Sequence, residues 1–353
     1  MQNFNFYTLV FDWGNTIMVD NPQYSGKMKD WPVVEAMENA AETLQKLFPD
    51  FNLVLATNAE DSTVDDIKLA LGRVNLESFF STIFTIRELQ AKKPHPDFFH
   101  QVSSKLDLPC HQLVMIGDDY QNDILAAKSA GWNAIWFNPT KKIASAHLPI
   151  QDMEIRDLSQ LPDMLRKPFL PDIQTCISWY LESGATHTLL AHVNNVAAIS
   201  YQIAIWLEEK GCLVDPILAH RGGLLHDLAK LRDESHKNHA ELAADILRDK
   251  NQIELAEIAR RHLIGNLLSE NEKPKTWEQK IVNYADKLSE GSAIVSLDQR
   301  LDALQKRYPD FSEKIKRNTP LIKNLENEIL VKIGNTPEEF LIKLKSSLFD
   351  GHS

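Results

Sequence analysis

Cysteine is scarce in this chain of 353 residues, which contains only three. Cys110, Cys176 and Cys212 lie far apart in the sequence and form no CxxC pair. Disulfide frameworks and thiolate zinc sites both depend on closely or regularly spaced cysteines, so we expect neither. Low cysteine use is typical of proteins in a reducing compartment, and the sequence therefore predicts a cytoplasmic protein.

Long apolar runs are missing as well. Hydrophobic residues make up 43% of the chain, but no stretch approaches the roughly 20 apolar residues that a membrane helix needs. The first residues lead directly into an apolar segment that ends at Asp12, without the basic region and cleavage site of a secretion signal. We expect a globular protein that is neither inserted in a membrane nor secreted.

Positive charge is in deficit. The chain has 38 Lys and Arg against 49 Asp and Glu, a formal net charge of -11. Proteins that bind nucleic acids contact phosphates through clustered Lys and Arg, so this balance argues against a nucleic-acid partner. A small phosphorylated or nucleotide substrate needs only a local positive site or a metal ion, and is therefore compatible with an acidic chain.

The length exceeds what one hydrophobic core ordinarily supports, so two domains are expected. In the first half, short apolar runs alternate with helical patterns. This alternation predicts an α/β fold with a doubly wound parallel sheet covered by helices. The expected strands are residues 7–11, 53–56, 114–116 and 134–137.

The alternation ends in a proline-rich stretch, residues 138–172, which we interpret as the linker. After it, nearly all apolar residues follow helical spacing, so the second domain is expected to be all-α. The predicted domains are residues 1–165 and 172–353. The linker prolines are Pro139, Pro149, Pro162, Pro168 and Pro171, and helices are expected near residues 188–209, 215–231, 238–249, 252–264, 276–288 and 294–307.

Polar side chains suited to phosphate and metal binding follow several of the expected strands. An aspartate such as Asp12 could simply cap the next helix. Ligands of parallel sheets, however, bind at the carboxyl ends of strands, and other strand or loop ends carry further carboxylates, a hydroxyl and an ammonium group. Together these groups could hold Mg²⁺ and a phosphoryl group. They are Asp12, Gly14, Asn15 and Thr16 in LVFDWGNT, Thr57 and Asn58 in LVLATN, Lys93 in KKPHPDFF, and Asp118, Asp119 and Asp123 in VMIGDDYQND.

In this order, the four segments resemble the haloacid dehalogenase superfamily over nearly all of residues 5–140. The resemblance implies a Rossmann-like fold in which Asp12 is the nucleophile and a Mg²⁺ ligand. Asp118 would be the second carboxylate ligand, and the Gly14 carbonyl can also ligate the metal. The remaining implied roles are phosphoryl binding by Thr57, Asn58 and Lys93, charge neutralisation during catalysis by Lys93, and support of the metal site or of Lys93 by Asp123.

Gly14 departs from the pattern of the phosphatases in this superfamily, which carry a second Asp two residues after the nucleophile. That Asp is the general acid and base, and its loss typically lowers the rate by about 10² to 10⁴-fold. Relatives without it include phosphonate-cleaving and dehalogenating enzymes, which usually carry caps. The chain from Asp12 to Thr57 is too short for a large helical cap, so we expect a small cap or none and an open site.

Five histidines and two aspartates lie in or at the ends of the helical patterns of the second half. A single His among apolar neighbours is more often a satisfied core residue than a ligand. Burying so many polar groups without a shared metal would leave most of them without partners, so a metal site is the better interpretation. The mixed N/O set suits Mn²⁺, Fe²⁺, Co²⁺, Ni²⁺ or Zn²⁺. The candidates are His192, His226, Asp227, His239, His262 and Asp286, with His187 as an alternative to His192 and His236 as an alternative to His239.

This second pattern resembles the HD superfamily of metal-dependent phosphohydrolases over about residues 185–310. Similar members hold two metal ions such as Mn²⁺ or Fe²⁺, and they include hydrolases of diadenosine tetraphosphate. The segment IVSLDQRLDALQKRYP differs from those hydrolases, so their substrate is not carried over. The resemblance implies that His192, His226, Asp227 and Asp286 bind the first metal, that His239 and His262 bind the second with Asp227 as the bridge, and that Lys230 faces the substrate phosphate as a catalytic residue.

Three functions are compatible with these patterns. The leading one is a bifunctional metal-dependent phosphohydrolase, whose HD domain hydrolyses a phosphoester or phosphoanhydride, expected to be in a nucleotide. Its N-terminal domain would be a phosphatase with an aspartyl nucleophile. The second is an HD hydrolase regulated by a catalytically degenerate N-terminal domain that binds a phosphorylated ligand. The third is a non-catalytic, metal-containing interaction protein.

Overall fold

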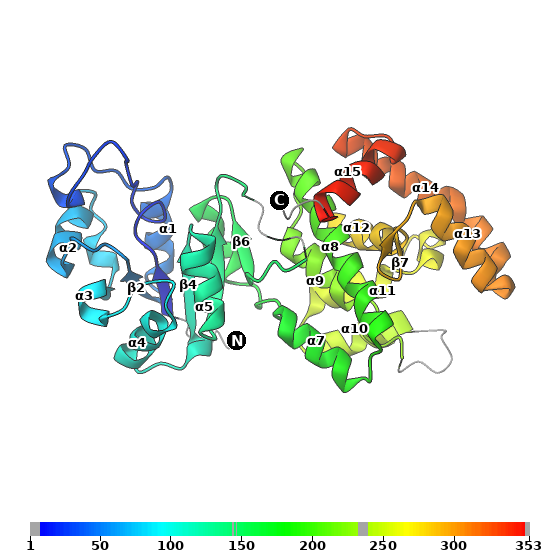
Figure 1. The fold of residues 1–353 in the computed structure, drawn as a ribbon, viewed down its shortest axis with the longest axis horizontal. Coiled ribbons are helices and arrows are strands. Elements are labelled where there is room, and N and C mark those ends of the chain that lie inside the picture. The colour runs from blue at the N-terminus through cyan, green and yellow to red at the C-terminus, as the bar shows by residue number, and fades with distance from the viewer. Residues whose placement is uncertain (1–7, 143–144, 146, 232–238, 350–353) are drawn as a thin grey trace. The chain divides into compact units, whose positions relative to one another are not determined.

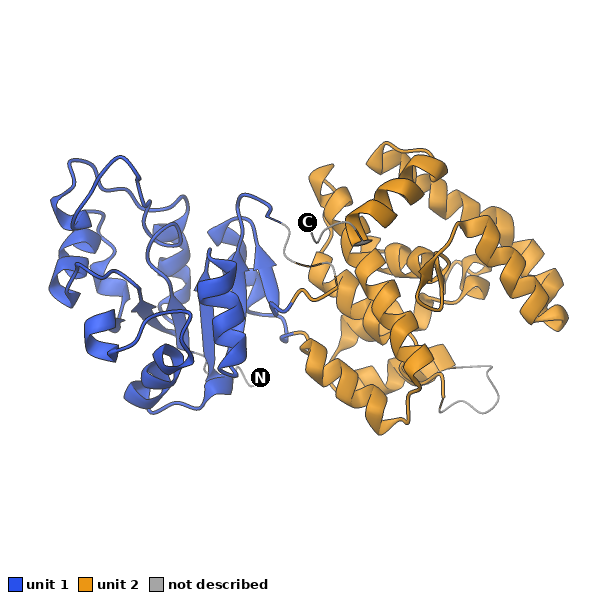
Figure 2. Ribbon diagram, viewed as in Figure 1, with its two compact units in different colours: residues 1–142, 150–169 blue, residues 143–149, 170–353 orange. Residues whose placement is uncertain are grey.

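The computed structural model describes residues 8–142, 145, 147–231 and 239–349. Its chain forms two compact units, coloured separately in Figure 2. Unit 1 comprises residues 1–142 and 150–169, and unit 2 comprises residues 143–149 and 170–353. The chain therefore enters unit 2 briefly, returns to complete unit 1, and then builds the rest of unit 2.

Unit 1 contains a six-stranded sheet in the order β3-β2-β1-β4-β5-β6, with every neighbouring pair parallel (Figure 1). The doubly wound α/β fold predicted from the sequence is confirmed. Two strands, β3 and β6, were not expected, because each contains only two hydrophobic residues, which is too few to give an apolar run that stands out. The strands are β1 Thr8–Phe11, β2 Asn52–Ala56, β3 Thr82–Phe84, β4 Leu113–Gly117, β5 Asn133–Phe137 and β6 Met153–Ile155.

Strand β6 corrects the interpretation of residues 138–172 as a linker. It pairs with β5 and is followed by two short helices that complete unit 1. Prolines are compatible with this arrangement because they lie outside β6, where no ladder hydrogen bond is lost.

Helices connect the strands of unit 1, and local side chains cap the first turns of several of them. Thr63 and Asp66 cap α2 reciprocally, and Pro96 occupies the first turn of α4, where its missing N–H costs nothing. Between β1 and α1 only the short helix η1 forms, so the expected small cap is confirmed. The helices are η1 Met28–Asp30, α1 Ala40–Leu47, α2 Val64–Gly72, η2 Glu77–Phe79, α3 Ile86–Leu89, α4 Pro96–Leu106, η3 Cys110–Gln112, η4 Tyr120–Leu125, α5 Ala126–Ser129, η5 Leu158–Gln160 and α6 Leu161–Met164.

The order of the strands decides where a ligand can bind in unit 1. The chain runs outward from β1 to β2 and β3, and then returns to β4 on the other side of β1. The strand order thus reverses between β1 and β4, and the crevice beyond the carboxyl ends of two such strands is the usual ligand site of open α/β sheets. Asp12 and Asp118 directly follow these two strands.

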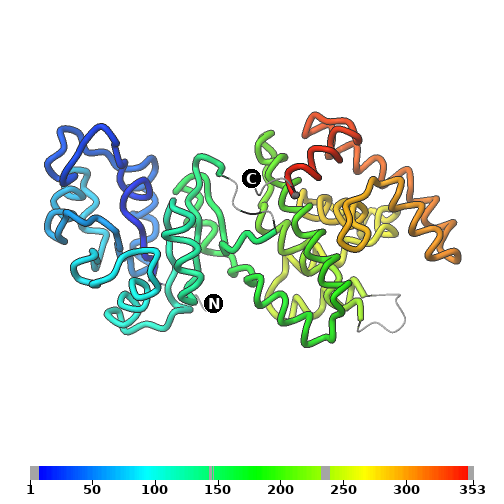
Figure 3. Tube along the Cα trace, viewed as in Figure 1, coloured from blue at the N-terminus to red at the C-terminus, as the bar shows by residue number. Residues whose placement is uncertain are grey.

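Unit 2 is helical, as predicted, apart from one small hairpin between two helices; its trace runs from green to red in Figure 3. The six expected helices are present. The hairpin and the helices α7, α14 and α15 were not expected. The elements are α7 Ile173–Glu182, α8 His187–Glu209, α9 Pro216–Leu225, α10 His239–Asp249, α11 Ile253–Arg261, η6 Ile264–Leu268, α12 Trp277–Asp286, β7 Ser289–Glu290, β8 Ala293–Ile294, α13 Leu297–Arg307, η7 Pro309–Phe311, α14 Ser312–Ile333 and α15 Pro337–Phe349.

Helix α8 forms the centre of unit 2 and is buried along most of its length. It packs closely on α9 because α9 carries Gly223 in the contact. A Cβ atom on Gly223 would lie 2.8 Å from the Cα atom of Ala197 in α8, closer than packed atoms allow. Gly223 therefore lets α8 and α9 approach, and His226 follows directly at the end of α9. In the described part of the chain, no helix combines the length and the apolar character that crossing a membrane requires.

We predict that Gly223→Ala lowers the free energy of unfolding of unit 2 by about 1–3 kcal/mol, because the added methyl group must push apart two backbones. Gly72→Ala is the matched control, since a Cβ atom there meets only the Glu77 side chain, at 3.6 Å. Calorimetric unfolding of both variants measures the difference. Equal stability of Gly223→Ala and the parent chain would contradict the close packing of α8 on α9.

Candidate active sites

Lys93 lies at the centre of a charged cluster in unit 1. Its buried Nζ atom is 2.5 Å from Asp12 Oδ1 and 2.6 Å from Asp123 Oδ1. Burial by itself would lower the pKa of Lys93, but the two carboxylates outweigh this effect and raise the pKa above its ordinary value. Lys93 therefore stays protonated and holds the Asp12 carboxylate in the cavity.

Three carboxylates of this cluster approach one another. Oxygen atoms of Asp12, Asp118 and Asp123 all lie within 4.8 Å of each other. Burial, and next the charge of Asp12, raise the pKa of Asp118 to about 6. Its carboxylate also accepts a hydrogen bond of 3.4 Å from Thr16 Oγ1. Because oxygen ligands with surplus negative charge are what Mg²⁺ binds, the residues fit that ion.

Thr57 and Asn58 follow β2 at the same cavity. The Thr57 hydroxyl accepts a hydrogen bond from the Ala59 N–H, which leaves its own hydrogen available to a ligand. The Asn58 side chain instead bonds both backbone groups of Lys93, at 2.9 Å and 2.8 Å. Asn58, predicted to bind substrate, is thus placed where it fixes the segment that carries Lys93.

The cavity has a volume of about 430 Å³ and is bordered by Gly14 and Asp20 as well as by the charged cluster. A Cβ atom on Gly14 would lie 3.5 Å from Asp20 Cβ and 3.7 Å from Asp20 Oδ2. The site therefore has room for a side chain at position 14. A steric clash of the Cβ atom at position 14 therefore does not explain why the Asp that phosphatases usually carry there is absent.

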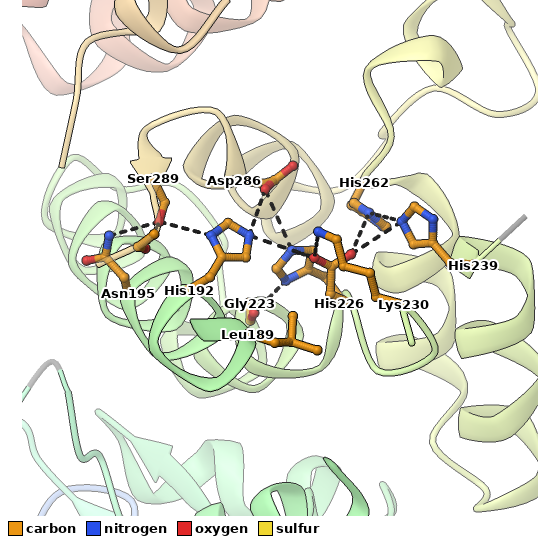
Figure 4. A network of polar contacts seen from close by, with 12 residues as sticks. Leu189, His192, Asn195, Gly223, His226, Lys230, His239, His262, Asp286 and Ser289 are labelled. Atoms are coloured by element: carbon orange, nitrogen blue, oxygen red, sulfur yellow. Dashed lines mark hydrogen bonds and ion pairs between the residues drawn. The ribbon is translucent and has the colours of Figure 1, made fainter. Parts of the chain in front are cut away.

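In unit 2, residues from four helices and the turn after α9 converge on one point (Figure 4). Two histidines face the carboxylate of Asp286 at the end of α12. His192 Nε2 is 3.2 Å and His226 Nε2 is 3.7 Å from Asp286 Oδ1. Ligand atoms of these three residues lie within 4.8 Å of one another, as do those of His226, Asp227 and His262.

Asp227 lies between two pairs of histidines. Its Oδ2 atom is 3.4 Å from His226 Nε2 and 3.8 Å from His192 Nε2. Its Oδ1 atom is 3.3 Å from His239 Nε2 and 3.5 Å from His262 Nε2. Each oxygen of this buried carboxylate therefore faces a different histidine pair, which is the geometry of a bridging ligand.

Hydrogen bonds made by the Nδ1 atoms of His226 and His262 determine which ring nitrogen carries the hydrogen. The other nitrogen, Nε2, faces Asp227. His226 Nδ1 lies 2.7 Å from the Gly223 carbonyl, and His262 Nδ1 lies 2.6 Å from the Ala259 carbonyl. A carbonyl only accepts, so each Nδ1 carries a hydrogen, and whenever the ring is neutral its lone pair is on Nε2. Among the described residues, His192 Nε2, His226 Nε2 and Asp227 Oδ1 are buried without a hydrogen-bond partner. These atoms fit a bound cation.

The electrostatics of this cluster also favour positive charge. Burial alone would lower the pKa of His226, but Asp227 and Asp286 raise it to about 9. Burial lowers the pKa of His262 to about 4, so that ring stays neutral. Lys230 Nζ lies 2.5 Å from Asp227 Oδ2, beside the cluster.

The two alternative ligands have different outcomes. His187 begins α8 and is exposed, so the structure brings His192 and not His187 into the cluster. His236 lies outside the described residues. His239 is the first residue of α10 and reaches the cluster directly: its Nε2 atom is 3.2 Å from His262 Nε2.

Comparison with known proteins assigns each unit to a family. Residues 12–137 match the model of haloacid dehalogenase-like hydrolases, and residues 189–291 match the HD domain. The chain joins a haloacid dehalogenase-like (HAD-like) hydrolase domain to an HD domain. These two matches, together with similarity to a pyrophosphatase, support hydrolysis of phosphate esters or anhydrides, as predicted from the sequence.

Three curated relatives show how far these similarities extend. An uncharacterized protein of Methanocaldococcus jannaschii is 32% identical over 39% of this chain and 87% of its own length. A tRNA (cytidine(56)-2'-O)-methyltransferase of Thermoplasma volcanium is 30% identical over 41% of this chain. The pyrophosphatase PpaX of Bacillus pumilus is 36% identical over 28% of this chain. The chain spans less than half the length of the latter two proteins, 45% and 44% respectively.

Two residues of the HD domain that were not predicted hold His192 in position. His192 Nδ1 lies 3.1 Å from Ser289 Oγ in the hairpin. Ser289 donates its own hydrogen to the Gly291 carbonyl and accepts from Asn195 Nδ2, so it can only accept from His192. This relay places the hydrogen on Nδ1 and the lone pair on Nε2. Asn195 lies one helical turn after His192 in α8, and this spacing is a signal from which Asn195 could have been predicted as a neighbour of His192.

We predict that Ser289→Ala weakens binding of Mn²⁺ to the HD domain by about 10–100-fold, because His192 loses the acceptor that fixes its ring. Ser289→Thr keeps the hydroxyl and should restore most of the affinity. Isothermal titration with Mn²⁺ measures the effect, with the exposed Ser178→Ala as control. Unchanged affinity in Ser289→Ala would show that the relay does not position His192.

Proposed function

We propose that the chain is a bifunctional metal-dependent phosphohydrolase whose HD domain carries the stronger activity. The HD domain would hydrolyse a phosphoester or phosphoanhydride of a nucleotide, and the HAD-like domain would be a weaker phosphatase that uses Asp12. A small phosphorylated or nucleotide substrate and a cytoplasmic location are parts of this proposal. The observation that carries it is the position of Asp227, with one oxygen toward each pair of histidines.

The ligand sets follow from that position. One divalent metal such as Mn²⁺ or Fe²⁺ would be held on the Oδ2 side of Asp227 and a second on its Oδ1 side. Nitrogen and carboxylate ligands suit these ions, which supply charge to activate water and to offset the charge of the phosphate. The first set is His192, His226, Asp227 and Asp286, and the second is His239, His262 and Asp227.

Other residues of the HD domain prepare the site for a phosphate. Lys230 contacts Asp227 and is half-exposed, so its ammonium group can turn toward a substrate. Ser289 and Asn195 keep His192 oriented. The buried walls around Asp227 exclude bulk water, which strengthens each of these electrostatic contacts.

In the HAD-like domain, Asp12 would attack the phosphorus and Lys93 would offset the charge of the phosphoryl group. Asp123 and Asn58 hold Lys93 from two sides, and Thr57 is free to donate its hydroxyl hydrogen. Mg²⁺ would be ligated by Asp12, Asp118, the Gly14 carbonyl and, directly or through Lys93, Asp123. The step left without a residue is proton transfer to the leaving group.

Gly14 also supports a second candidate function. A domain that retains the phosphate-binding residues but lacks the acid can bind a phosphorylated ligand and turn it over slowly. The HAD-like domain would then regulate the HD hydrolase.

We predict that Gly14→Asp raises the phosphatase activity of the HAD-like domain by about 10²-fold, since it supplies the absent acid where space exists. Turnover of p-nitrophenyl phosphate with Mg²⁺ is the measurement, made in an Asp227→Ala background so that the HD domain does not contribute. Gly14→Asn has the same shape without the proton and is the control. An equal gain in both variants would mean that the acid is not what limits the rate.

We predict that Asp227→Ala abolishes both metal retention and hydrolysis by the HD domain, because one substitution removes a ligand from both metals. His239→Ala and His262→Ala should cost less, since each disturbs one metal. Bound metal is measured by elemental analysis, and turnover by a phosphorylated-metabolite screen with Mg²⁺, Mn²⁺ and Fe²⁺.

The screen also ranks the two domains within the full-length chain. Asp227→Ala should remove most of the activity that the screen finds, whereas Asp12→Asn should remove the smaller part. Full metal occupancy and near-normal turnover in Asp227→Ala would remove the HD phosphohydrolase proposal. A larger loss in Asp12→Asn would reverse the ranking.

A further inference from the structure

Arg300 is a buried guanidinium with an unpaired N–H donor. It lies in α13 and is 8% exposed. Its Nη1 atom pairs with Glu290, but its buried Nε–H has no hydrogen-bond partner among the described residues. A guanidinium carries five N–H donors in a planar fork that fits phosphate or carboxylate, and leaving buried donors unpaired is costly. An anionic ligand would satisfy them.

The hairpin ties Arg300 to the wall of the HD site. Ser289 of β7 holds the metal-ligand candidate His192, and the next residue, Glu290, holds Arg300. Helix α13, which carries Arg300, begins three residues after the end of β8. Only a short segment therefore separates this helix from the hairpin. Burial lowers the pKa of Lys230, but Asp227 and Asp286 raise it above its ordinary value; the charge of Arg300 acts against this rise, so its field reaches the residue that contacts Asp227.

We propose that Arg300 binds a second phosphate group of the HD domain's substrate, beside the phosphate that is hydrolysed. This inference rests on the proposed function of the HD domain. Lys230 contacts Asp227 and serves the phosphate at the metal ligands, whereas Arg300 has no contact with the ligand set in the described residues and serves a phosphate farther out. The substrate class is therefore a compound with at least two phosphates, such as a phosphoanhydride, rather than a monoester.

Arg307 provides a matched control for this role. It lies in the same helix and pairs with the same Glu290, but its side chain is 51% exposed. If Arg300 acted only by holding the hairpin through Glu290, then Arg307→Gln and Arg300→Gln would have similar effects. A phosphate-binding role predicts that only Arg300→Gln weakens anion binding.

The test is isothermal titration of the full-length, Mn²⁺-loaded protein with inorganic pyrophosphate and with orthophosphate. Arg300→Gln should weaken pyrophosphate binding about tenfold and orthophosphate binding by less than about threefold, because a charge-assisted contact to the second phosphate is lost. Arg300→Lys should retain part of the affinity, and Arg307→Gln should leave both affinities unchanged. Elemental analysis should find the same Mn²⁺ content in all variants.

The Asp227→Ala protein separates failure of this inference from failure of the proposed function. If Asp227→Ala binds pyrophosphate as the parent chain does, the HD site is not the binding site and the proposed function fails with the inference. If Asp227→Ala loses binding but Arg300→Gln does not, only the role of Arg300 is wrong. Equal weakening by Arg300→Gln and Arg307→Gln, or loss of Mn²⁺ in Arg300→Gln, would make Arg300 structural and overturn the inference.

Discussion

Burial of negative charge is the constraint on which both sites depend. A carboxylate removed from water needs positive charge or hydrogen-bond donors close by, or it takes up a proton. In the HAD-like domain, Lys93 lies between Asp12 and Asp123 and supplies part of that charge. In the HD domain, Asp227 is surrounded by imidazole rings and Lys230. The residues around each carboxylate cluster are therefore also the residues that a metal and a phosphate would use.

The two folds bring these charges together in different ways. In the HAD-like domain, parallel strands end at one edge of a sheet, so Asp12 and Asp118 meet because β1 and β4 are neighbours. In the HD domain, α8 and α9 meet across Gly223, and their ligands face a third helix. The sheet leaves an open cavity, whereas the bundle encloses its ligands. This difference fits the proposal of a stronger activity in the HD domain, where the proposed ligands are enclosed.

Residues that carry charge or follow a regular pattern could be found from the sequence. Short, uninterrupted apolar runs predicted four of the six strands, and helical spacing predicted the helices that carry the HD ligands. The strands β3 and β6 were missed because each contains only two hydrophobic residues, which form no pattern of their own. Their pairing with β2 and β5 is what makes them strands. The hairpin was missed for the same reason.

The sequence by itself determined the two families, the parallel sheet and which side chains have the chemistry of the sites, because those depend on residue type and spacing along the chain. Only the tertiary structure decided how the side chains face one another. It put the two oxygens of Asp227 toward different histidines, turned Asn58 onto the backbone of Lys93, and brought Ser289 to His192 and Glu290 to Arg300. Apart from the one between His226 and Asp227, these contacts join residues at least 10 positions apart in the chain, and packing of whole elements sets their distances.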